Sequence, residues 1–320
     1  MTSSARLAAG GLDRALDSVP PAAGAEVMGT GIVSIALSLD GNQTLSRILL
    51  VITALTWLAL AVLAPLRIRR EKTRAIADLR TPAALTSVAG TGVLGVRLLM
   101  LGWTWAGIAA LVITLVVWAL LLGPVLGHLK TPTVGASLML TVSTESLAVL
   151  AAMIAATEHA SWLLVAALAL FALGLGFYVF VIARLDLREL AVGYGDHWIT
   201  GGALAISTLA AAKLLSGAKA MAILGDGGGV LKYLALGLWV LSMLWLPVLV
   251  AGELLHPRLS YDVRRWSTVF PFGMYAACSF AVGAAVPARA ITSFAQVWVW
   301  VALAVWAAVL VATIRRAAPV

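Results

Sequence analysis

Three ionisable side chains, Glu26, Arg97 and Glu145, lie inside stretches of sequence that are otherwise apolar. A charge at the centre of a membrane-spanning helix costs roughly 2.5–3.5 kcal/mol, so such residues usually line an aqueous path, pair with a partner or carry protons. Glu145 follows Ser143 and Thr144, which favours a buried structural or proton-linked carboxylate. Glu26 lies about five residues into its apolar stretch, near the mouth of the predicted path, where water can solvate it. Arg97 fits equally well a side chain that reaches the outer headgroups or one that lines a pore.

A proline between two aromatic residues, in the string Phe270-Pro271-Phe272-Gly273, forms a second group. A proline inside a helix removes a backbone hydrogen bond and bends the chain. The backbone dipoles that such a bend exposes can hold anions without a fixed charge. Phe270, directly before the bend, is placed to plug a narrow path. Ordinary packing is the competing interpretation, and composition alone favours it.

Small residues form a third pattern, with Gly-Thr-Gly at 29–31 and again at 90–92. Residues 90–95 have the spacing of a GxGxxG nucleotide motif, but that motif follows a strand and is accompanied by an acidic residue about 20 residues later. Here the string lies inside an apolar stretch, so close helix packing is the better interpretation. No metal, cofactor or catalytic residue is expected, because Cys278 is the only cysteine and the four histidines are scattered.

The elements that must position these residues follow from the composition of the chain. Of its 320 residues, 62% are hydrophobic and only 11% are charged, and the mean hydropathy is +1.02. A soluble domain carries about 25% charged residues, because it must cover its surface with polar groups. A soluble enzyme is therefore excluded, and the sequence predicts an all-α integral membrane protein.

Apolar runs long enough to cross a bilayer, which takes about 20 residues, predict ten transmembrane helices. Asp196 opens the seventh run and is expected either to cap that helix or to act as a partner of its dipole. The predicted parts are a cytoplasmic N-terminal tail (1–20), a ten-helix transporter or channel domain (21–315) and a cytoplasmic C-terminal tail (316–320). The ten runs are 21–39, 46–66, 82–101, 104–127, 133–154, 161–183, 196–215, 227–254, 265–287 and 293–314.

The basic residues between the runs predict the orientation of the helices. Of the 22 Lys and Arg residues, 16 fall on the side that holds both termini, five fall on the other side, and Arg97 lies within a run. The positive-inside rule then places both termini in the cytoplasm of a protein in the plasma (inner) membrane. This topology accounts for the net charge of +8, so nucleic acid is not an expected partner.

The odd and even runs differ in composition. In windows of 20 residues, the odd runs hold 29 Gly, Ser and Thr residues and the even runs 12, whereas the even runs hold nine tryptophans and the odd runs one. Small and hydroxyl residues let helices approach closely and can line a wet path, while Trp and Leu suit lipid and its interfaces. We therefore expect five inner odd helices surrounded by five outer even helices.

Two strings resemble a known family. VMGTGI at 27–32 is similar to the first-helix signature of the tellurite-resistance/dicarboxylate transporter family, and WSTVFP at 266–271 resembles its ninth-helix motif. That family includes bacterial tellurite-resistance proteins, fungal malate permeases, sulfite exporters and plant slow anion channels. The resemblance implies five helical hairpins, a central pore lined by the odd helices, and a homotrimer in the lipid bilayer with one pore per subunit.

The resemblance also implies site residues. Phe270, with Pro271 beside it, would be the gate. The chain departs from the family at 24–26, where Gly-Ala-Glu replaces bulky residues; a carboxylate at that mouth repels anions unless it is protonated or paired. The pore-lining candidates, from the resemblance and from the small-residue pattern, are Gly29, Thr30, Gly31, Gly90, Thr91, Ser143, Thr144 and Gly273.

The function expected from these features is transmembrane transport of small anions without enzymatic chemistry. The candidate anions are C4-dicarboxylate, tellurite, sulfite, and chloride or nitrate, and the pore is expected to be gated by a phenylalanine. A proton-coupled anion exporter that uses Glu26 or Glu145 is the alternative. A membrane-embedded lipid or prenyl transferase is a remote one, because it would need clustered acidic residues to bind metal and pyrophosphate.

Overall fold

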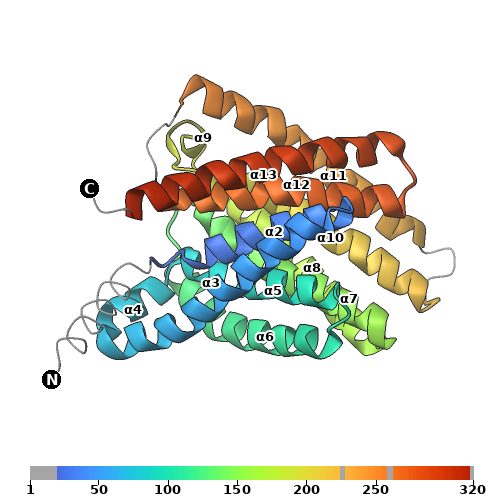
Figure 1. The fold of residues 1–320 in the computed structure, drawn as a ribbon, viewed down its shortest axis with the longest axis horizontal. Helices are drawn as coiled ribbons and strands as arrows, with labels where there is room; N and C mark the ends of the chain where they lie inside the picture. The colour runs from blue at the N-terminus through green and yellow to red at the C-terminus, as the bar shows by residue number, and fades with distance from the viewer. Residues whose placement is uncertain (1–19, 224–227, 258–261, 318–320) are drawn as a thin grey trace.

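The computed structural model describes residues 20–223, 228–257 and 262–317. These residues form helices joined by short turns, with no strand among them and one isolated bridge between Thr133 and Leu185. Figure 1 shows long helices packed along one another, with α4, α9 and the C-terminal end of α13 at the same end of the bundle. That end carries most of the basic residues and is called the basic end below.

The long helices of the described ranges form an inner and an outer group, and short helices connect them. The inner helices are α2 (Gly24–Leu39), α5 (Thr86–Leu99), α7 (Met139–Glu158), α10 (Ile199–Ala220) and α12 (Trp266–Ala285). The outer helices are α3 (Gln43–Arg70), α6 (Thr104–Gly127), α8 (Ser161–Ile182), α11 (Gly228–Leu255) and α13 (Arg289–Ala317). The short helices are α4 (Lys72–Leu79), α9 (Glu189–Val192), η1 (Pro82–Leu85), η2 (Gly135–Leu138), η3 (Asp196–Trp198) and η4 (Val263–Arg265).

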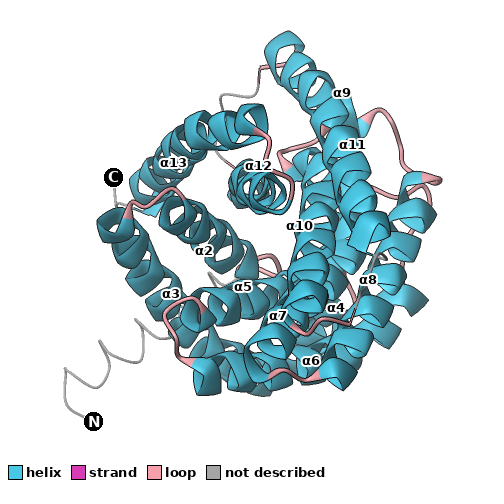
Figure 2. Cartoon of the chain, turned by 90° about the vertical axis from the view of Figure 1, so that its right-hand side faces the viewer, coloured by secondary structure: helices cyan, strands magenta, loops and turns pink. Residues whose placement is uncertain are grey.

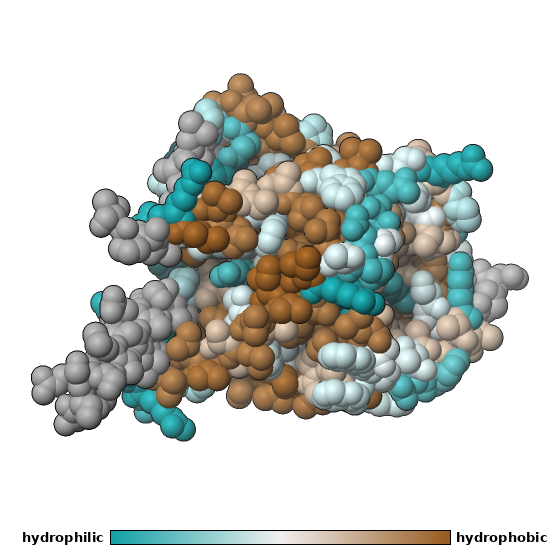
Figure 3. Space-filling model, viewed as in Figure 1, coloured by the Kyte–Doolittle hydropathy of each residue, from teal (hydrophilic) through white to brown (hydrophobic). Residues whose placement is uncertain are grey.

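The five inner helices close a ring. Contacts run from α2 to α5, α7, α10 and α12 and back to α2, and each inner helix also contacts the outer helix that follows it in the sequence (Figure 2). The apolar windows of α5, α7, α10 and α12 are 72–94% buried, whereas those of the outer helices are 17–22% buried. The outer helices therefore present apolar side chains outward, and the face in Figure 3 is mainly hydrophobic, as contact with lipid requires.

Nine helices in the described ranges are long and apolar enough to cross a membrane. The remaining inner helix, α2, is apolar but has only 16 residues. Its length is about 24 Å at the usual rise per residue, which is short of a hydrocarbon core of about 30 Å. The described residues are thus all-helical, with nine apolar helices of spanning length and a tenth, α2, that is apolar but shorter.

Residues 67–81 separate the second and third predicted runs, where a loop is expected, but most of this basic segment is helical. Helix α3 continues to Arg70, and α4 follows after a single residue. Nη2 of Arg67 lies 2.6 Å from Oδ2 of Asp78, and this ion pair holds α4 against the end of α3. Because the segment is rich in charges, hydropathy ends the span early although the helix itself continues.

A polar bond joins every outer helix to the ring. Each outer helix donates to the inner helix that comes next round the ring, and its donor is a tryptophan indole or, in α8, a tyrosine hydroxyl. This arrangement explains why tryptophan and the small hydroxyl residues segregate into different helices. The bonds are Trp57 to Thr91 Oγ1 (2.9 Å), Trp118 to Thr144 Oγ1 (3.0 Å), Tyr178 to the Thr200 carbonyl (3.3 Å), Trp239 to Ser279 Oγ (2.8 Å) and Trp306 to Thr30 Oγ1 (3.0 Å).

Candidate functional site

A small cavity of about 20 Å³ lies on the axis of the ring, with residues of all five inner helices in its wall. This volume holds about one water molecule. Ser146 is the one residue of the wall with a polar side chain, and its hydroxyl donates to the carbonyl of Ser143 (2.8 Å). The axis is therefore narrow and apolar here. The wall consists of Ile32, Ile35, Gly92, Val93, Val96, Ser146, Val149, Ile206, Leu209 and Met274.

Phe270 lies on the side of α12 that faces the axis. Successive residues of a helix are about 100° apart, so its neighbours define its direction. A Cβ atom placed on Gly202 of α10 would lie 2.7 Å from Pro271, and one placed on Gly29 of α2 would lie 3.1 Å from Val269. Phe270 thus lies between the directions of α10 and α2, and Met274, about one turn further on the same face, lines the axial cavity. Together these positions direct Phe270 toward the inside of the ring, where its side chain is fully buried.

Met274 and Phe272 support this direction. Met274 follows Phe270 by about one helical turn, and it lines the axial cavity. Phe272 instead packs against the indole rings of two tryptophans. Its centroid is 4.6 Å from that of Trp198 and 5.5 Å from that of Trp298, onto which it stacks. Phe270 and Phe272 thus point to opposite sides of α12.

The glycines named as pore-lining candidates lie where ring helices touch. Gly29 meets α12, as described above. A Cβ atom placed on Gly31 would lie 2.7 Å from Val93 of α5, and one on Gly90 would lie 3.1 Å from the carbonyl oxygen of Gly24 in α2. Gly273 faces α2 in the same way, at 2.5 Å from Ile32. These positions let the ring helices pack closely.

The hydroxyl candidates are all bonded. Thr30, Thr91 and Thr144 accept the indole N–H groups of outer helices, so their hydroxyl groups face the outer layer. The Ser143 hydroxyl donates within its own helix, to the carbonyl of Leu140 (3.3 Å). None of these four hydroxyls belongs to the wall of the axial cavity.

Glu145 lies between α7, α8 and α10. Its side chain is fully buried, and its Oε1 accepts a hydrogen bond from Ser207 (2.9 Å). Oε2 has no hydrogen-bond partner among the described residues. A Cβ atom placed on Gly174 of the outer helix α8 would lie 2.7 Å from Oε1. The carboxyl group is therefore behind the ring, on the side of the outer layer.

Arg97 and Glu26 lie near opposite ends of the ring. Arg97 is only 1% exposed, so its side chain does not reach out to the headgroups. Its Nε and Nη2 donate to the Ser46 hydroxyl at 3.1 and 2.9 Å, and that hydroxyl donates to the carbonyl of Ser34 (2.7 Å). These bonds join the far ends of α2, α3 and α5. Glu26 is half-buried in the first turn of α2, where the helix dipole favours a negative charge.

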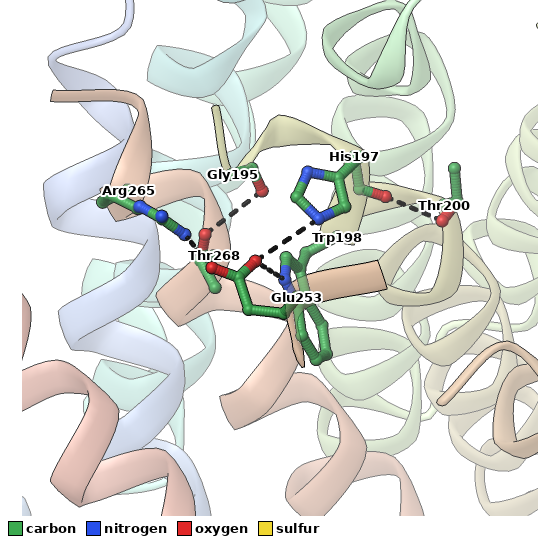
Figure 4. A network of polar contacts seen from close by, with 7 residues as sticks. All are labelled: Gly195, His197, Trp198, Thr200, Glu253, Arg265 and Thr268. Atoms are coloured by element: carbon green, nitrogen blue, oxygen red, sulfur yellow. Dashed lines mark hydrogen bonds and ion pairs between the residues drawn. The ribbon is translucent and has the colours of Figure 1, made fainter. Parts of the chain in front are cut away.

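A polar network at the basic end was not found from the sequence. Glu253 of α11 accepts from Nη1 of Arg265 (2.9 Å) and from the indole of Trp198 (3.4 Å), and it lies 3.7 Å from Nε2 of His197 (Figure 4). Next to it, the hydroxyl of Thr268 donates to the carbonyl of Gly195 (3.2 Å). The network joins the ends of α10, α11 and α12 close to Phe270. Its partners lie 12 to 73 residues apart in the sequence, so no local pattern reveals it.

Asp196 is the first residue of η3, directly before α10, and the residue in the capping position is Gly195, whose φ of 117° favours glycine. Asp196 is therefore not the cap, whereas its place in the first turn agrees with the alternative role as a partner of the helix dipole. Asp196 is buried, and its Oδ1 has no hydrogen-bond partner among the described residues. Within the same ranges, no three His, Cys, Asp or Glu side chains gather to hold a metal ion.

Comparison with known proteins identifies the family. Two uncharacterized membrane proteins, from two strains of Mycobacterium tuberculosis, are each 35% identical over 149 residues, which cover 43% of this chain and 73% of each relative. Residues 18–314 match the model of the SLAC1 family, described as voltage-dependent anion channel. This confirms the resemblance to the tellurite-resistance/dicarboxylate transporter family that the helix-one and helix-nine strings indicate. The chain belongs to the SLAC1 family of voltage-dependent anion channels.

Proposed function

We propose that this protein conducts small anions along the axis of the inner ring and that Phe270 closes the path. Its family implies anion channel or transporter activity rather than enzymatic chemistry. The observation that carries the proposal is the position of the buried Phe270 ring, on the axis side of α12 and one turn from Met274 in the cavity wall. A cavity with room for about one water excludes a hydrated ion, so the structure corresponds to a closed path.

Within the candidate set, we propose that chloride and nitrate pass more readily than the divalent forms of C4-dicarboxylate, sulfite and tellurite. The cavity wall is aliphatic apart from Ser146 and contains no cationic side chain. An anion must therefore give up most of its hydration without a compensating charge. The cost of desolvation rises with the square of the charge in the Born picture, so a monovalent anion meets the smaller barrier.

Flux into proteoliposomes tests the gate. Phe270→Ala removes the ring from the axis, and we expect chloride flux to rise by about an order of magnitude, which corresponds to about 1.4 kcal/mol of barrier. Chloride, nitrate, malate, sulfite and tellurite should be compared at equal concentration, with and without a pH gradient.

The control is Phe272→Ala on the opposite side of the same helix. Loss of its stacking with Trp298 should lower stability and leave the flux per folded molecule nearly unchanged. If neither substitution raises flux while both lower stability, Phe270 only packs, and the gate assignment fails.

We further propose that the chain assembles as a homotrimer of five-hairpin subunits, with both termini in the cytoplasm at the plasma membrane. The contact of each inner helix with the outer helix that follows it supports the hairpins. Light scattering of the detergent-solubilised protein measures the number of chains directly. We expect the mass of three chains of 33.3 kDa each plus detergent. A mass that corresponds to one chain would contradict the proposed trimer.

The proton-coupled exporter finds less support. Glu145 contacts Gly174 and Ser207 behind the ring, so a proton bound there would not meet an anion on the axis. Glu26, in the first turn of α2, is the remaining carboxylate candidate for that mechanism.

A further inference from the structure

A large groove lies outside the ring, between the outer helices α3 and α6, with α5 behind it. Its volume is about 640 Å³, which falls in the range of roughly 300–1,000 Å³ that is typical of small-molecule sites. The side chains on its rim are exposed; Leu120 of α6, for example, is 68% exposed. The groove therefore opens to the apolar surface that meets the hydrocarbon of a membrane.

Away from Arg80, the polar side chains in the described wall of the groove are all hydrogen-bonded. The indole of Trp57 donates to Thr91 (2.9 Å), the hydroxyl of Thr91 donates to the carbonyl of Ser87 (2.8 Å), and the hydroxyl of Ser87 donates to the carbonyl of Ala84 (2.7 Å). The rest of the wall is almost entirely aliphatic. A groove of this kind suits an apolar chain and is a poor site for water, which needs two to four polar partners.

Arg80 gives the basic end of the groove a positive charge. It lines the groove and is exposed, and among the described residues its guanidinium makes no hydrogen bond or ion pair. The nearby acid, Asp78, is already paired with Arg67. The segment 67–80 holds six basic and two acidic residues, and such a segment beside a membrane attracts anionic headgroups.

We propose that this groove binds an anionic phospholipid, with an acyl chain between α3 and α6 and the phosphate at Arg80. Lipid is the occupant that the surroundings supply, because the opening faces hydrocarbon and Arg80, the one charged residue of the described wall, lies at the headgroup end. The groove also touches Gly24 of α2 and Gly90 of α5, so a bound chain contacts the back of two ring helices. The proposal does not depend on anion conduction.

Quenching of Trp57 fluorescence by brominated lipid tests the site. The full chain is placed in phosphatidylcholine vesicles that contain a small fraction of either phosphatidylglycerol or phosphatidylcholine with bromine on the acyl chain. The fluorescence that comes from Trp57 is obtained by subtracting the emission of Trp57→Phe from that of the wild type. We expect phosphatidylglycerol to reach half-maximal quenching at a fraction about fivefold lower, the effect of one basic side chain at an anionic surface.

Matched substitutions separate the groove from its surroundings. Arg80→Gln should remove the preference for phosphatidylglycerol, whereas Arg69→Gln, which is exposed but does not line the groove, should keep it. Ala61→Phe fills the groove and should abolish quenching by either lipid. Ala59→Phe, on the same helix but outside the groove wall, should leave quenching intact.

Three results would overturn the proposal. Equal quenching by both brominated lipids means that Trp57 only meets bulk lipid, and so does unchanged quenching in Ala61→Phe. No quenching in the wild type means that another part of the chain or a second copy fills the groove. Because Trp57→Phe breaks a bond to Thr91, mass spectrometry of co-purified lipid provides a second measurement: phosphatidylglycerol should be retained by the wild type and Ala59→Phe and lost from Ala61→Phe.

Discussion

Phe270 and Phe272 have the same side chain, lie two residues apart and occupy different environments. Their separation of about 200° round the helix can be predicted from the sequence. The sequence does not predict which of the two side chains faces the axis, because that depends on where α2 and α10 pack against α12. Pro271 against Gly202, and Val269 against Gly29, set the rotation of α12 in the structure.

The threonines of the inner helices show the same limit of prediction. Their positions in inner helices are predicted from composition, but the direction of their hydroxyl groups is not. Thr30, Thr91 and Thr144 bond to indoles of the outer layer. The partners of Thr91 and Thr144 lie on the preceding hairpin, and the partner of Thr30 lies on the last helix of the chain. The pattern of a single sequence indicates that one face of a helix carries small polar residues, but it does not indicate which neighbouring helix that face contacts.

Glu145 gives a prediction at the residue scale. Glu145→Gln keeps an acceptor for the Ser207 hydroxyl, so we expect anion flux and its response to a pH gradient to stay unchanged. Glu145→Ala removes that acceptor and should lower the free energy of unfolding by about 0.5–1.5 kcal/mol for the lost bond, with a further loss for the cavity. Flux in proteoliposomes and thermal unfolding in detergent measure the two effects. Loss of the pH response in Glu145→Gln would reinstate the proton-coupled mechanism.

The outer helices bind the ring in one repeated way. Each reaches past its own inner partner to the next inner helix, through a tryptophan in α3, α6, α11 and α13 and a tyrosine in α8. The composition of the odd and even runs predicts the two layers because indoles and small hydroxyls are required on different helices. The bonds themselves close the ring and are a property of the assembled fold.

These bonds give a prediction at the element scale. Trp306→Phe keeps most of the ring and removes its N–H, so the bond between α13 and α2 is lost. Hydrogen bonds between membrane helices average about 0.6 kcal/mol, and we expect a decrease of that size in the free energy of unfolding. Trp105→Phe is the control, because Trp105 is 74% exposed and makes no hydrogen bond within the described ranges.

A double-mutant cycle of Trp306→Phe with Thr30→Val measures the bond itself. The coupling energy should be close to the loss in the single substitution. A coupling near zero, or an equal loss in Trp105→Phe, would show that the indole N–H does not join these helices.

Charged segments limited the prediction of elements. Hydropathy predicts a span that ends near residue 66, but α3 continues to Arg70 and α4 follows. The network around Glu253 was missed because Arg265 and His197 belong to other helix ends. In both cases the charges are satisfied by tertiary contacts, and a single sequence carries no record of those contacts.

The orientation of the whole molecule in the membrane gives a further prediction. With Cys278→Ser as background, Arg74→Cys and Arg188→Cys should react with a membrane-impermeant thiol reagent only after the cells are permeabilised. Ile223→Cys, at the other end of the bundle and exposed, should react in intact cells. The basic end then faces the cytoplasm, as the positive-inside rule requires. Labelling of Arg74→Cys from outside would reverse the orientation.

If the ring axis carries anions and the Phe270 ring obstructs it, conduction must depend on the size of the side chain at this position. Chloride flux per folded molecule in proteoliposomes measures that dependence. We expect flux to increase in the order Phe270, Phe270→Leu, Phe270→Val and Phe270→Ala, to about tenfold at alanine, while the same series at Phe272 stays flat. Flux that is independent of side-chain size at Phe270, or that rises equally at Phe272, would contradict this role of the Phe270 ring.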